Sequence, residues 1–465
     1  MPLIELLPPN TLPLGQLMRR CAINGMIHIR GHAEDFNSWE RQGCSDWSWD
    51  KVLPYFQRSE EDGSGLGLSE AEHSDACDHF IASCENGGLK RIDNFNQGKQ
   101  EGVGYYQATI ANGRRQSTAK GYLRPAKDRA NLTVLTTATV EKIHFSEQRA
   151  SGISAKVKRR QKRFYADREV ILSAGTIGSP QLLQLSGIGP RELLEKHGIA
   201  PVIDLPPVGQ NLQDHLGTMA TYRVEGLHTI YNEMSPWRLL LQAYRYLRYR
   251  RGLLSHPSAH VGAFFRSSEN EPRPDIQLFF MPVGGSRDSN DNSIMDKAPA
   301  VTAMIQNVLP ESRGSVVINS GNPHDAPTIT ANYLATEKDR QAMLSGFKRI
   351  RQFFSQEPIK DRCREEIRPG KAVQTDEEIL DYIRRESSTG YHPVGTCKMG
   401  VGNDAVVDPQ LRVHGCSGLR VVDASIMPTI VAGNTNAATV MIAEKAADLI
   451  LQSAEASAQN AAAPT

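Results

Sequence analysis

Residues 168–189 read REVILSAGTIGSPQLLQLSGIG, and this stretch decides the fold class. Its first part, 168–175, is a short apolar run that ends in glycine, which predicts a buried strand. Ser179 and Pro180 then form a helix-start signal, and Gly187 is typical of a helix end. A strand, a glycine-containing turn and a helix in this order are the unit of α/β folds.

A similar pattern returns near the C-terminus. LRVVD (419–423) is typical of a strand, and residues 434–452 predict a long helix capped by Asn434 or Asn436. Residues 216–390 carry mixed strand and helix signals, and the tail 453–465 is predicted to be disordered. The sequence therefore predicts a discontinuous nucleotide-type domain with a second domain inserted into it.

Composition narrows the class of protein. The chain has 465 residues, of which 39% are hydrophobic and 23% charged, as in soluble globular proteins. A formal net charge of +1 gives no reason to expect nucleic acid as a partner. Seven cysteines without a CxxC pair make a disulfide scaffold or a zinc ribbon unexpected. With neither a spanning apolar run nor a secretory signal pattern, we expect a cytoplasmic protein.

Residues 235–251, SPWRLLLQAYRYLRYRR, predict a helix rich in leucine, tyrosine and arginine. Two interpretations are open. The favoured one is a surface helix that packs its leucine face inward. The alternative is a basic amphipathic helix in peripheral contact with the inner face of a membrane, where the protein would feed electrons to quinone.

Candidate chemistry lies in the C-terminal part. His392 stands in the glycine- and proline-bounded loop YHPVGTCKMG (391–400), and Asn434 stands at a helix start, where free N–H groups suit an anion, a phosphate or a reduced flavin. Each residue alone is more often structural. His256 and His260 are spaced like metal ligands on a helix, but Pro257 argues against that helix. No metal site is predicted.

Taken together, several segments resemble the glucose–methanol–choline (GMC) family of flavin oxidoreductases, in particular its choline-dehydrogenase-like alcohol dehydrogenases. The segments are CAINGMIHIRGHAEDFNSWE (21–40), DWSWDKVLPYF (46–56), YQATIANGRRQSTAKGYLRPA (106–126), GTIGSPQLLQLSGIG (175–189), VGQNLQDH (208–215), SRGSVVINS (312–320) and the block from 391 to 450. The resemblance implies a Rossmann-like FAD-binding domain (1–45, 100–215 and 391–452) and an α+β substrate domain on an antiparallel sheet (46–99 and 216–390).

The resemblance also implies roles for single residues. His392 falls on the catalytic histidine and Asn434 on its partner in the catalytic pair. Ile23 stands where some members attach flavin covalently through a histidine, so noncovalent FAD is implied. The implied cofactor-binding positions are Asn24, Val140, Ala174, Gly175, Asp423, Ala424, Asn436 and Thr439.

This assignment predicts an alcohol oxidation. An imidazole can take the proton of the alcohol, an asparagine amide can hydrogen-bond the developing alkoxide, and the flavin takes the hydride. The predicted partners are a small primary alcohol and a quinone or other carrier as electron acceptor. His260 stands where choline-specific members carry a carboxylate, so a neutral alcohol is expected rather than choline.

Two departures from the family pattern define an alternative. The pattern begins only near residue 15, and roughly 70 to 80 residues with the GxGxxG unit are not found. MRRC (18–21) also stands where the family has GGSS. A truncated, noncatalytic remnant with poor FAD binding is therefore the alternative function. For the chain as given, the sequence predicts a largely colourless, marginally soluble protein with little activity.

Overall fold

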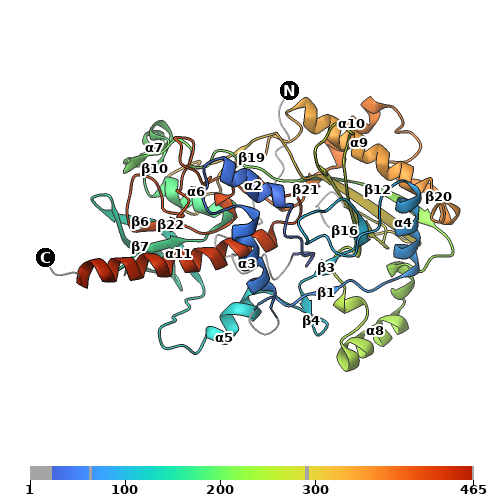
Figure 1. The fold of residues 1–465 in the computed structure, drawn as a ribbon, viewed down its shortest axis with the longest axis horizontal. Coiled ribbons are helices and arrows are strands. Elements are labelled where there is room, and N and C mark those ends of the chain that lie inside the picture. The colour runs from blue at the N-terminus through green and yellow to red at the C-terminus, as the bar shows by residue number, and fades with distance from the viewer. Residues whose placement is uncertain (1–23, 62–64, 288–292, 463–465) are drawn as a thin grey trace.

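The protein's structure is a computed structural model that describes residues 24–61, 65–287 and 293–462. One half is built on a large antiparallel sheet, and the other on short parallel strand pairs and helices (Figure 1). Each half has its own hydrophobic cluster, and a third, smaller cluster contains Phe264 and Tyr106. The mixed α/β content agrees with the predicted class.

The large sheet has seven strands, and all its pairings are antiparallel. Their order is β2–β13–β14–β17–β12–β20, with β21 also paired to β12. The strands span Gly102–Tyr105 (β2), Leu216–Val224 (β12), Val261–Phe265 (β13), Ile276–Met281 (β14), Ala300–Asn307 (β17), Cys363–Arg368 (β20) and Ser388–Thr389 (β21). This is the antiparallel sheet predicted for the inserted domain.

The two faces of this sheet have different surroundings. Side chains alternate along a strand, so Ala263 of β13 shares a face with its cross-strand partner Leu278 of β14. That face joins the core formed with α4 (Asp75–Asn86), α9 (Glu337–Phe354) and α10 (Asp376–Glu386). The opposite face carries Phe264 and its partner Gln277, and it contributes to the candidate site described below.

The other half contains the strand, turn and helix signalled at 168–189. β9 (Val170–Leu172) pairs in parallel with β22 (Leu419–Val421), although the two are far apart in sequence. α6 (Gly175–Leu185) follows β9, and α11 (Asn436–Ala462) comes after β22. The same half contains α2 (Ala33–Arg41), α3 (Trp49–Glu60), α7 (Arg191–Lys196), β6 (Ala138–Ser146), β7 (Arg149–Val157) and β8 (Arg160–Tyr165).

The remaining elements are short. The strands are β1 (Ser69–Glu70), β3 (Gln107–Ala108), β4 (Ile110–Ala111), β5 (Arg114–Arg115), β10 (Ile188–Gly189), β11 (Ile203–Asp204), β15 (Gly285–Arg287), β16 (Ser293–Met295), β18 (Ser315–Val317) and β19 (Thr328–Thr330). The helical turns are η1 (Ala119–Leu123), α5 (Arg124–Ala126), η2 (Ile230–Glu233), η3 (Leu253–Ser255), η4 (Lys360–Arg362) and η5 (Ala424–Ile426).

Helix α6 begins earlier than the sequence predicts. It starts at Gly175 with Ala174 as its N-cap residue, so Pro180 lies inside the helix. The predicted cap, Ser179, instead accepts from the Ala174 N–H at 3.1 Å and donates to Asp423 Oδ2 at 2.5 Å. The prediction was wrong because the Ser179 hydroxyl makes a tertiary contact with a segment that is remote in sequence.

Three predicted boundaries also differ. Helix α11 continues to Ala462, so residues 453–462 of the tail are helical rather than disordered, as their alanine content favours. Val52 and Phe56 of α3 belong to the hydrophobic cluster of the parallel-strand half, although 46–99 was assigned to the substrate domain. β2 belongs to the antiparallel sheet, although 100–215 was assigned to the FAD domain.

Helix α8 (Pro236–Tyr249) turns its apolar side outward. The favoured prediction, a leucine face packed inward, was wrong, because Leu240 and Leu247 are exposed and Gln242 is the buried residue of this helix. Figure 1 shows α8 at the edge of the molecule, far from α11. Among the described helices, α8 included, none has the length and apolarity needed to cross a bilayer.

Candidate active site

His392 and Asn434 lie in direct contact. His392 stands in the loop after β21, and Asn434 stands two residues before the first residue of α11. His392 Nε2 is 3.1 Å from Asn434 Nδ2, and both residues are half-buried. The structure therefore brings together the two residues that the sequence predicts to form the catalytic pair.

A run of hydrogen bonds determines which atoms of this pair carry hydrogen. Tyr106 donates its hydroxyl hydrogen to the Leu278 carbonyl at 2.9 Å, so its oxygen accepts from Gln277 Nε2 at 3.0 Å. The same amide nitrogen donates to Asn434 Oδ1 at 3.2 Å. Asn434 Nδ2 therefore faces His392, and an amide nitrogen only donates. His392 Nε2 must accept, which leaves the proton of its ring on Nδ1.

The second nitrogen of His392 meets another histidine. His392 Nδ1 is 3.1 Å from His215 Nδ1, and the two rings are nearly perpendicular at 82°. With the proton on His392 Nδ1, His215 Nδ1 is the acceptor. The pKa of His215 lies well below its ordinary value. The larger cause is burial of the ring, and the second is the positive charge that His392 can carry. His215 is therefore neutral at neutral pH and can keep accepting this hydrogen bond.

Asp214 anchors the backbone on both sides of the two rings. Its Oδ1 accepts from the backbone N–H groups of His392 at 2.8 Å and His215 at 2.9 Å. Its Oδ2 accepts from the hydroxyls of Tyr333 and Thr389. Burial raises the pKa of Asp214, while these hydrogen bonds act in the opposite direction. Four donors on one buried carboxyl group hold the His392 loop beside residues 214 and 215.

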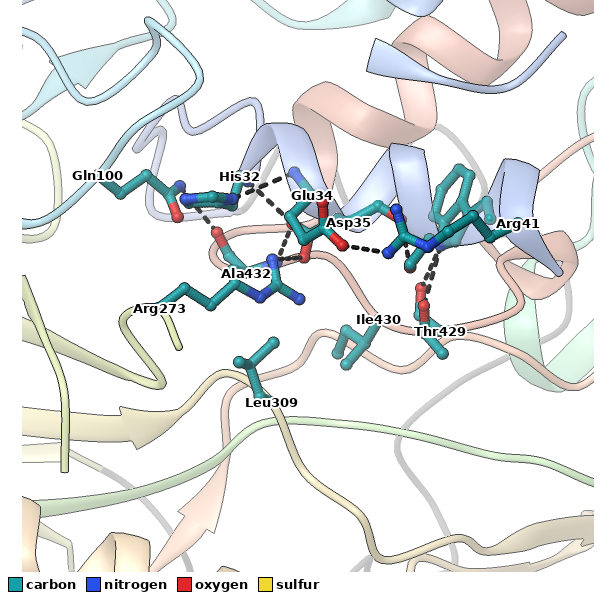
Figure 2. Close-up of polar contacts among 12 residues, drawn as sticks. His32, Glu34, Asp35, Arg41, Gln100, Arg273, Leu309, Thr429, Ile430 and Ala432 are labelled. Atoms are coloured by element: carbon teal, nitrogen blue, oxygen red, sulfur yellow. Dashed lines mark hydrogen bonds and ion pairs between the residues drawn. The ribbon is translucent and has the colours of Figure 1, made fainter. Parts of the chain in front are cut away.

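The loop that leads to Asn434 is held by Asp35 (Figure 2). The buried Asp35 accepts from the Ala432 N–H through Oδ2 at 2.7 Å, and its Oδ1 contacts Arg273 Nη1 at 2.5 Å. Gln100 Nε2 donates to the Ala432 carbonyl at 2.9 Å. Figure 2 shows these side chains converging on Ala432, which lies two residues before Asn434.

The next residues carry this loop into helix α11. Gly433 has φ +128°, and a Cβ there would lie 2.5 Å from Ile29 Cγ2, so only glycine fits. Asn436 is the first residue of the helix, and Thr439 donates its hydroxyl to the Thr435 carbonyl at 2.8 Å. The first turn of a helix carries partial positive charge. Both predicted cofactor residues therefore lie in the first turn of α11, which begins two residues after Asn434 and favours an anion.

Another group of predicted cofactor residues meets at the carboxyl ends of β9 and β22. The Gly175 N–H donates to Asp423 Oδ2 at 2.9 Å, and Ala174 and Ala424 stand next to these two in sequence. Gly175 has φ +79°, and apart from its chain neighbours and the backbone of its own helix no heavy atom lies within 4 Å of where its Cβ would be. Ligands of open α/β sheets bind at this end of the strands. The open space over Gly175 fits such a ligand.

The last two predicted cofactor residues, Asn24 and Val140, stand on other segments of the chain. Asn24 Oδ1 accepts from the Met26 N–H at 3.1 Å and from Arg115 Nη1 at 2.8 Å. Val140 lies in β6 opposite Ala155, partly buried against the core of the parallel-strand half. Ile23, where a covalent flavin link would form, is outside the residues that the structure describes.

His256 and His260 are in contact, although they do not share a helix. His260 Nε2 is 3.0 Å from His256 Nδ1, and His256 Nε2 is 2.6 Å from Glu72 Oε2. Burial and then the charge on His256 lower the pKa of His260 to about 4. Among the residues that the structure describes, no three or more histidine, cysteine, aspartate or glutamate side chains are grouped so that they could hold a metal ion.

Sequence reasoning missed the residues that support the catalytic pair. Asp214 and His215 stand in VGQNLQDH, a segment that resembles the family but does not by itself indicate a role for either residue. Gln277 lies inside the apolar run IQLFFM, where a single amide among hydrophobic residues was the available signal. Asp35 gives no signal of its own in the sequence, since acidic residues are common in the first turn of a helix. Only the fold brings these groups to His392 and Asn434.

Comparison with known proteins identifies the family of this chain. A family model described as GMC oxidoreductase matches residues 20–217 with its N-terminal part and 310–443 with its C-terminal part. The chain is also 39% identical over 447 residues to alcohol dehydrogenase (acceptor) of Pseudomonas putida, covering 93% of this chain and 80% of that protein. The chain belongs to the GMC oxidoreductase family.

Other relatives of this GMC oxidoreductase, and solved structures similar to it, support the same family. Human mitochondrial choline dehydrogenase is 39% identical over 444 residues, which cover 92% of this chain and 74% of the human protein. Formate oxidase superposes with a TM-score of 0.86 at 27% identity, over 92% of this chain and 82% of that one. Pyridoxine 4-oxidase from Mesorbium loti has a TM-score of 0.79 at 30% identity, over 91% and 81% of the two chains.

The family and fold confirm the predicted recognition and architecture, an FAD-binding domain with a substrate domain. This GMC oxidoreductase is an FAD-dependent oxidoreductase of the alcohol and choline dehydrogenase type. The residues present fit that cofactor. Gly175 leaves open space at the end of the parallel strands, and the first turn of α11 offers partial positive charge beside His392.

Proposed function

We propose that this chain oxidises a small primary alcohol to the aldehyde, with His392 as the proton acceptor and Asn434 as the donor to the substrate oxygen. One observation carries the proposal. The hydrogen bonds from Leu278 through Tyr106, Gln277 and Asn434 require His392 Nε2 to be unprotonated. An unprotonated imidazole nitrogen in contact with an amide N–H₂ can take a proton while the amide stabilises the resulting oxyanion.

The proton and the electron pair have separate destinations. The alcohol O–H proton goes to His392 Nε2, while Nδ1–H stays in its hydrogen bond with His215 Nδ1. Asn434 Nδ2 hydrogen-bonds the alkoxide oxygen that this step creates, and Asp214 keeps the His392 backbone in place. Bound FAD supplies the acceptor for the hydride that leaves the substrate carbon. The alcohol would thus become the aldehyde, with its proton on His392 and its hydride given up to the acceptor that a bound FAD would provide.

We propose that the cofactor is held by the residues that the family resemblance names. Ala174, Gly175, Asp423 and Ala424 would meet the phosphate side, and Asn436 and Thr439 would meet the ring side. Asn24 and Val140 would contact the flavin and the adenine half, respectively. Support comes from the open space over Gly175 and from the position of Asn436 in the first turn of α11.

The substrate that we propose is a neutral alcohol rather than choline. The sheet face that carries Gln277 also carries Phe279 and Met281, and by strand alternation His260. A pKa of about 4 keeps His260 uncharged at neutral pH, so it provides no negative charge for a trimethylammonium group. In the described residues, His260 Nδ1 and Gln306 Oε1 are buried polar atoms without a hydrogen-bond partner, which favours a ligand with a hydroxyl group.

Steady-state kinetics test the substrate class. The ratio kcat/KM is measured for choline and for short and aromatic primary alcohols, with a quinone analogue or an artificial carrier as acceptor. The proposal expects the neutral alcohols to react faster. Faster turnover of choline would contradict it. His260→Glu supplies a carboxylate at the same position, and we expect it to shift the ratio toward choline.

The electron acceptor that we propose is a quinone or another carrier. Among the relatives, the Pseudomonas protein is named for an acceptor, while several bacterial relatives are named oxygen-dependent choline dehydrogenases. Reoxidation of the reduced protein by a quinone analogue and by dissolved oxygen, followed by absorbance, separates these two acceptors. Faster reoxidation by oxygen than by the quinone analogue would overturn this part of the proposal.

A further inference from the structure

Helix α8 carries a stripe of exposed apolar side chains. Trp237, Leu240, Tyr244 and Leu247 are spaced three or four residues apart, which places them along one side of the helix. Their side chains are unusually open for such residues, with relative exposures of 64% for Trp237, 73% for Leu240 and 70% for Leu247. Leu254, in the turn after the helix, is exposed as well. An exposed stripe of this kind in a soluble fold marks an interaction surface.

The inner side of the same helix is polar. Gln242 is buried, donates from Nε2 to Glu233 Oε2 at 2.7 Å and accepts from the Leu253 N–H at 3.3 Å. Arg238 Nη1 donates to the Asn232 carbonyl at 3.1 Å. The helix is therefore attached to the protein through hydrogen bonds while its apolar side faces out. This is the reverse of the usual surface helix, whose apolar side faces the core.

The charges around the stripe have one sign. Residues 236–251 contain Arg238, Arg245, Arg248, Arg250 and Arg251 and no aspartate or glutamate. Arg238 lies 3.4 Å from Glu233, whereas none of the other four forms an ion pair with a carboxylate in the described ranges. Arg248 and Arg250 lie over the rings of Tyr249 and Tyr246 at 5.1 Å and 5.2 Å. The apolar stripe is thus bordered by unneutralised cations.

We propose that α8 and the turn at Leu254 form a docking surface for an anionic lipid bilayer. The stripe would enter the boundary between headgroups and acyl chains with the helix axis parallel to the membrane, while the arginines reach anionic headgroups. Tryptophan and tyrosine are the side chains that favour this boundary, since they combine an apolar ring with a polar group. The described part of the chain would then lie peripherally on a membrane face.

Charge favours a bilayer over a second copy of this chain. A symmetric contact through α8 would place the same face of both copies together, and so would bring two sets of arginines into proximity. Like charges at a contact are unfavourable, whereas anionic headgroups complement them. This inference does not depend on the proposed catalytic function, because every residue that it uses lies outside the catalytic pair and the cofactor positions.

Vesicle co-sedimentation of the full chain tests the proposal. Two vesicle types are used, phosphatidylcholine alone and phosphatidylcholine with about one third phosphatidylglycerol. Leu240→Ser with Leu247→Ser removes two apolar anchors, and Arg245→Glu, Arg248→Glu and Arg251→Glu reverse three charges. Matched controls are Leu451→Ser on α11, also an exposed leucine, and Arg159→Glu, Arg160→Glu and Lys162→Glu at the β7–β8 turn, also three exposed cations. Circular dichroism checks that each variant is folded.

The expected result is stronger binding to the anionic vesicles than to the neutral ones. Each cation near an anionic surface contributes roughly fivefold in affinity, so the triple arginine variant should lose about a hundredfold, and the controls should not. The double leucine variant should also lose binding. Equal binding to both vesicle types, equal loss in the controls, or stripe-dependent self-association in ultracentrifugation without vesicle binding would each overturn the proposal.

Discussion

Gln277 donates from Nε2 to Asn434 Oδ1 across 3.2 Å, and this bond orients the amide that faces His392. Gln277 is itself oriented by Tyr106, because the Tyr106 hydroxyl donates its hydrogen to the Leu278 carbonyl and its oxygen accepts from Gln277. A main-chain oxygen of the antiparallel sheet thus determines the tautomer of a histidine in the other half of the molecule. The sheet face that carries Gln277 therefore contributes to the candidate catalytic centre.

Gln277→Leu should disturb the catalytic pair without removing either member. Asn434 would lose the donor that fixes its amide, so His392 would sample both tautomers. We expect kcat to fall about ten- to a hundredfold, the usual effect of losing an orienting partner. In ¹⁵N NMR of histidine-labelled protein, the signal of the unprotonated His392 Nε2 should weaken. Gln181→Leu is the control, since Gln181 is also buried but donates to the Asp325 carbonyl. An unchanged tautomer in Gln277→Leu would refute the role of Gln277.

Asp35→Ala should lower both stability and turnover. It removes the acceptor of the Ala432 N–H and leaves Arg273 without its carboxylate, and breaking a buried ion pair costs about 3–5 kcal/mol. The loop before Asn434 would also lose an anchor. Urea denaturation measures the free energy of unfolding, with the exposed Asp93→Ala as control. The double variant with Arg273→Ala should recover part of the loss. A single variant as stable as the control would contradict this account of the loop.

Stability should fall in mild acid because of buried histidines. The pKa of His260 is lowered to about 4 in the folded protein, whereas an unfolded histidine titrates near 6.5. The unfolded state therefore takes up this proton first, and stability is lost as the pH falls from about 6.5 to about 4, by about 3 kcal/mol for His260. His215, whose pKa is also lowered, acts in the same direction. Urea unfolding at pH 7 and pH 5 measures the loss, which should be smaller in His260→Gln and unchanged in the exposed His324→Gln.

Gly175→Ala should reduce flavin retention. The methyl group would enter the open space at the ends of β9 and β22, and alanine also disfavours the positive φ. Gly198→Ala is a matched control, because Gly198 also has a positive φ, +69°, and no atom within 4 Å of its Cβ position. Absorbance of protein mixed with FAD and then desalted gives the bound fraction. Equal retention in both variants would remove Gly175 from the cofactor site. Absence of flavin from the unaltered chain would favour the noncatalytic alternative.

The sequence predicts the parts of the fold that depend on local pattern. Strand β9, helix α6 and the pairing of His392 with Asn434 follow from short segments or from their family resemblance. Three features could not be predicted, because each depends on contacts between remote segments. Ser179 bonds Asp423 rather than capping its helix, Gln277 reaches Asn434 across the sheet, and α8 is attached through Gln242. A leucine-rich helix pattern alone does not tell which side faces the protein.

The most direct test of the central claim is the rate at which a primary alcohol bleaches the flavin absorbance when it is mixed anaerobically with FAD-loaded protein. We predict that His392→Ala slows this reduction by about two to four powers of ten, as expected for loss of a general base, while flavin content and circular dichroism stay unchanged. Reduction of the His392→Ala protein at a rate close to that of the unaltered protein would contradict the assignment of His392 as the proton acceptor.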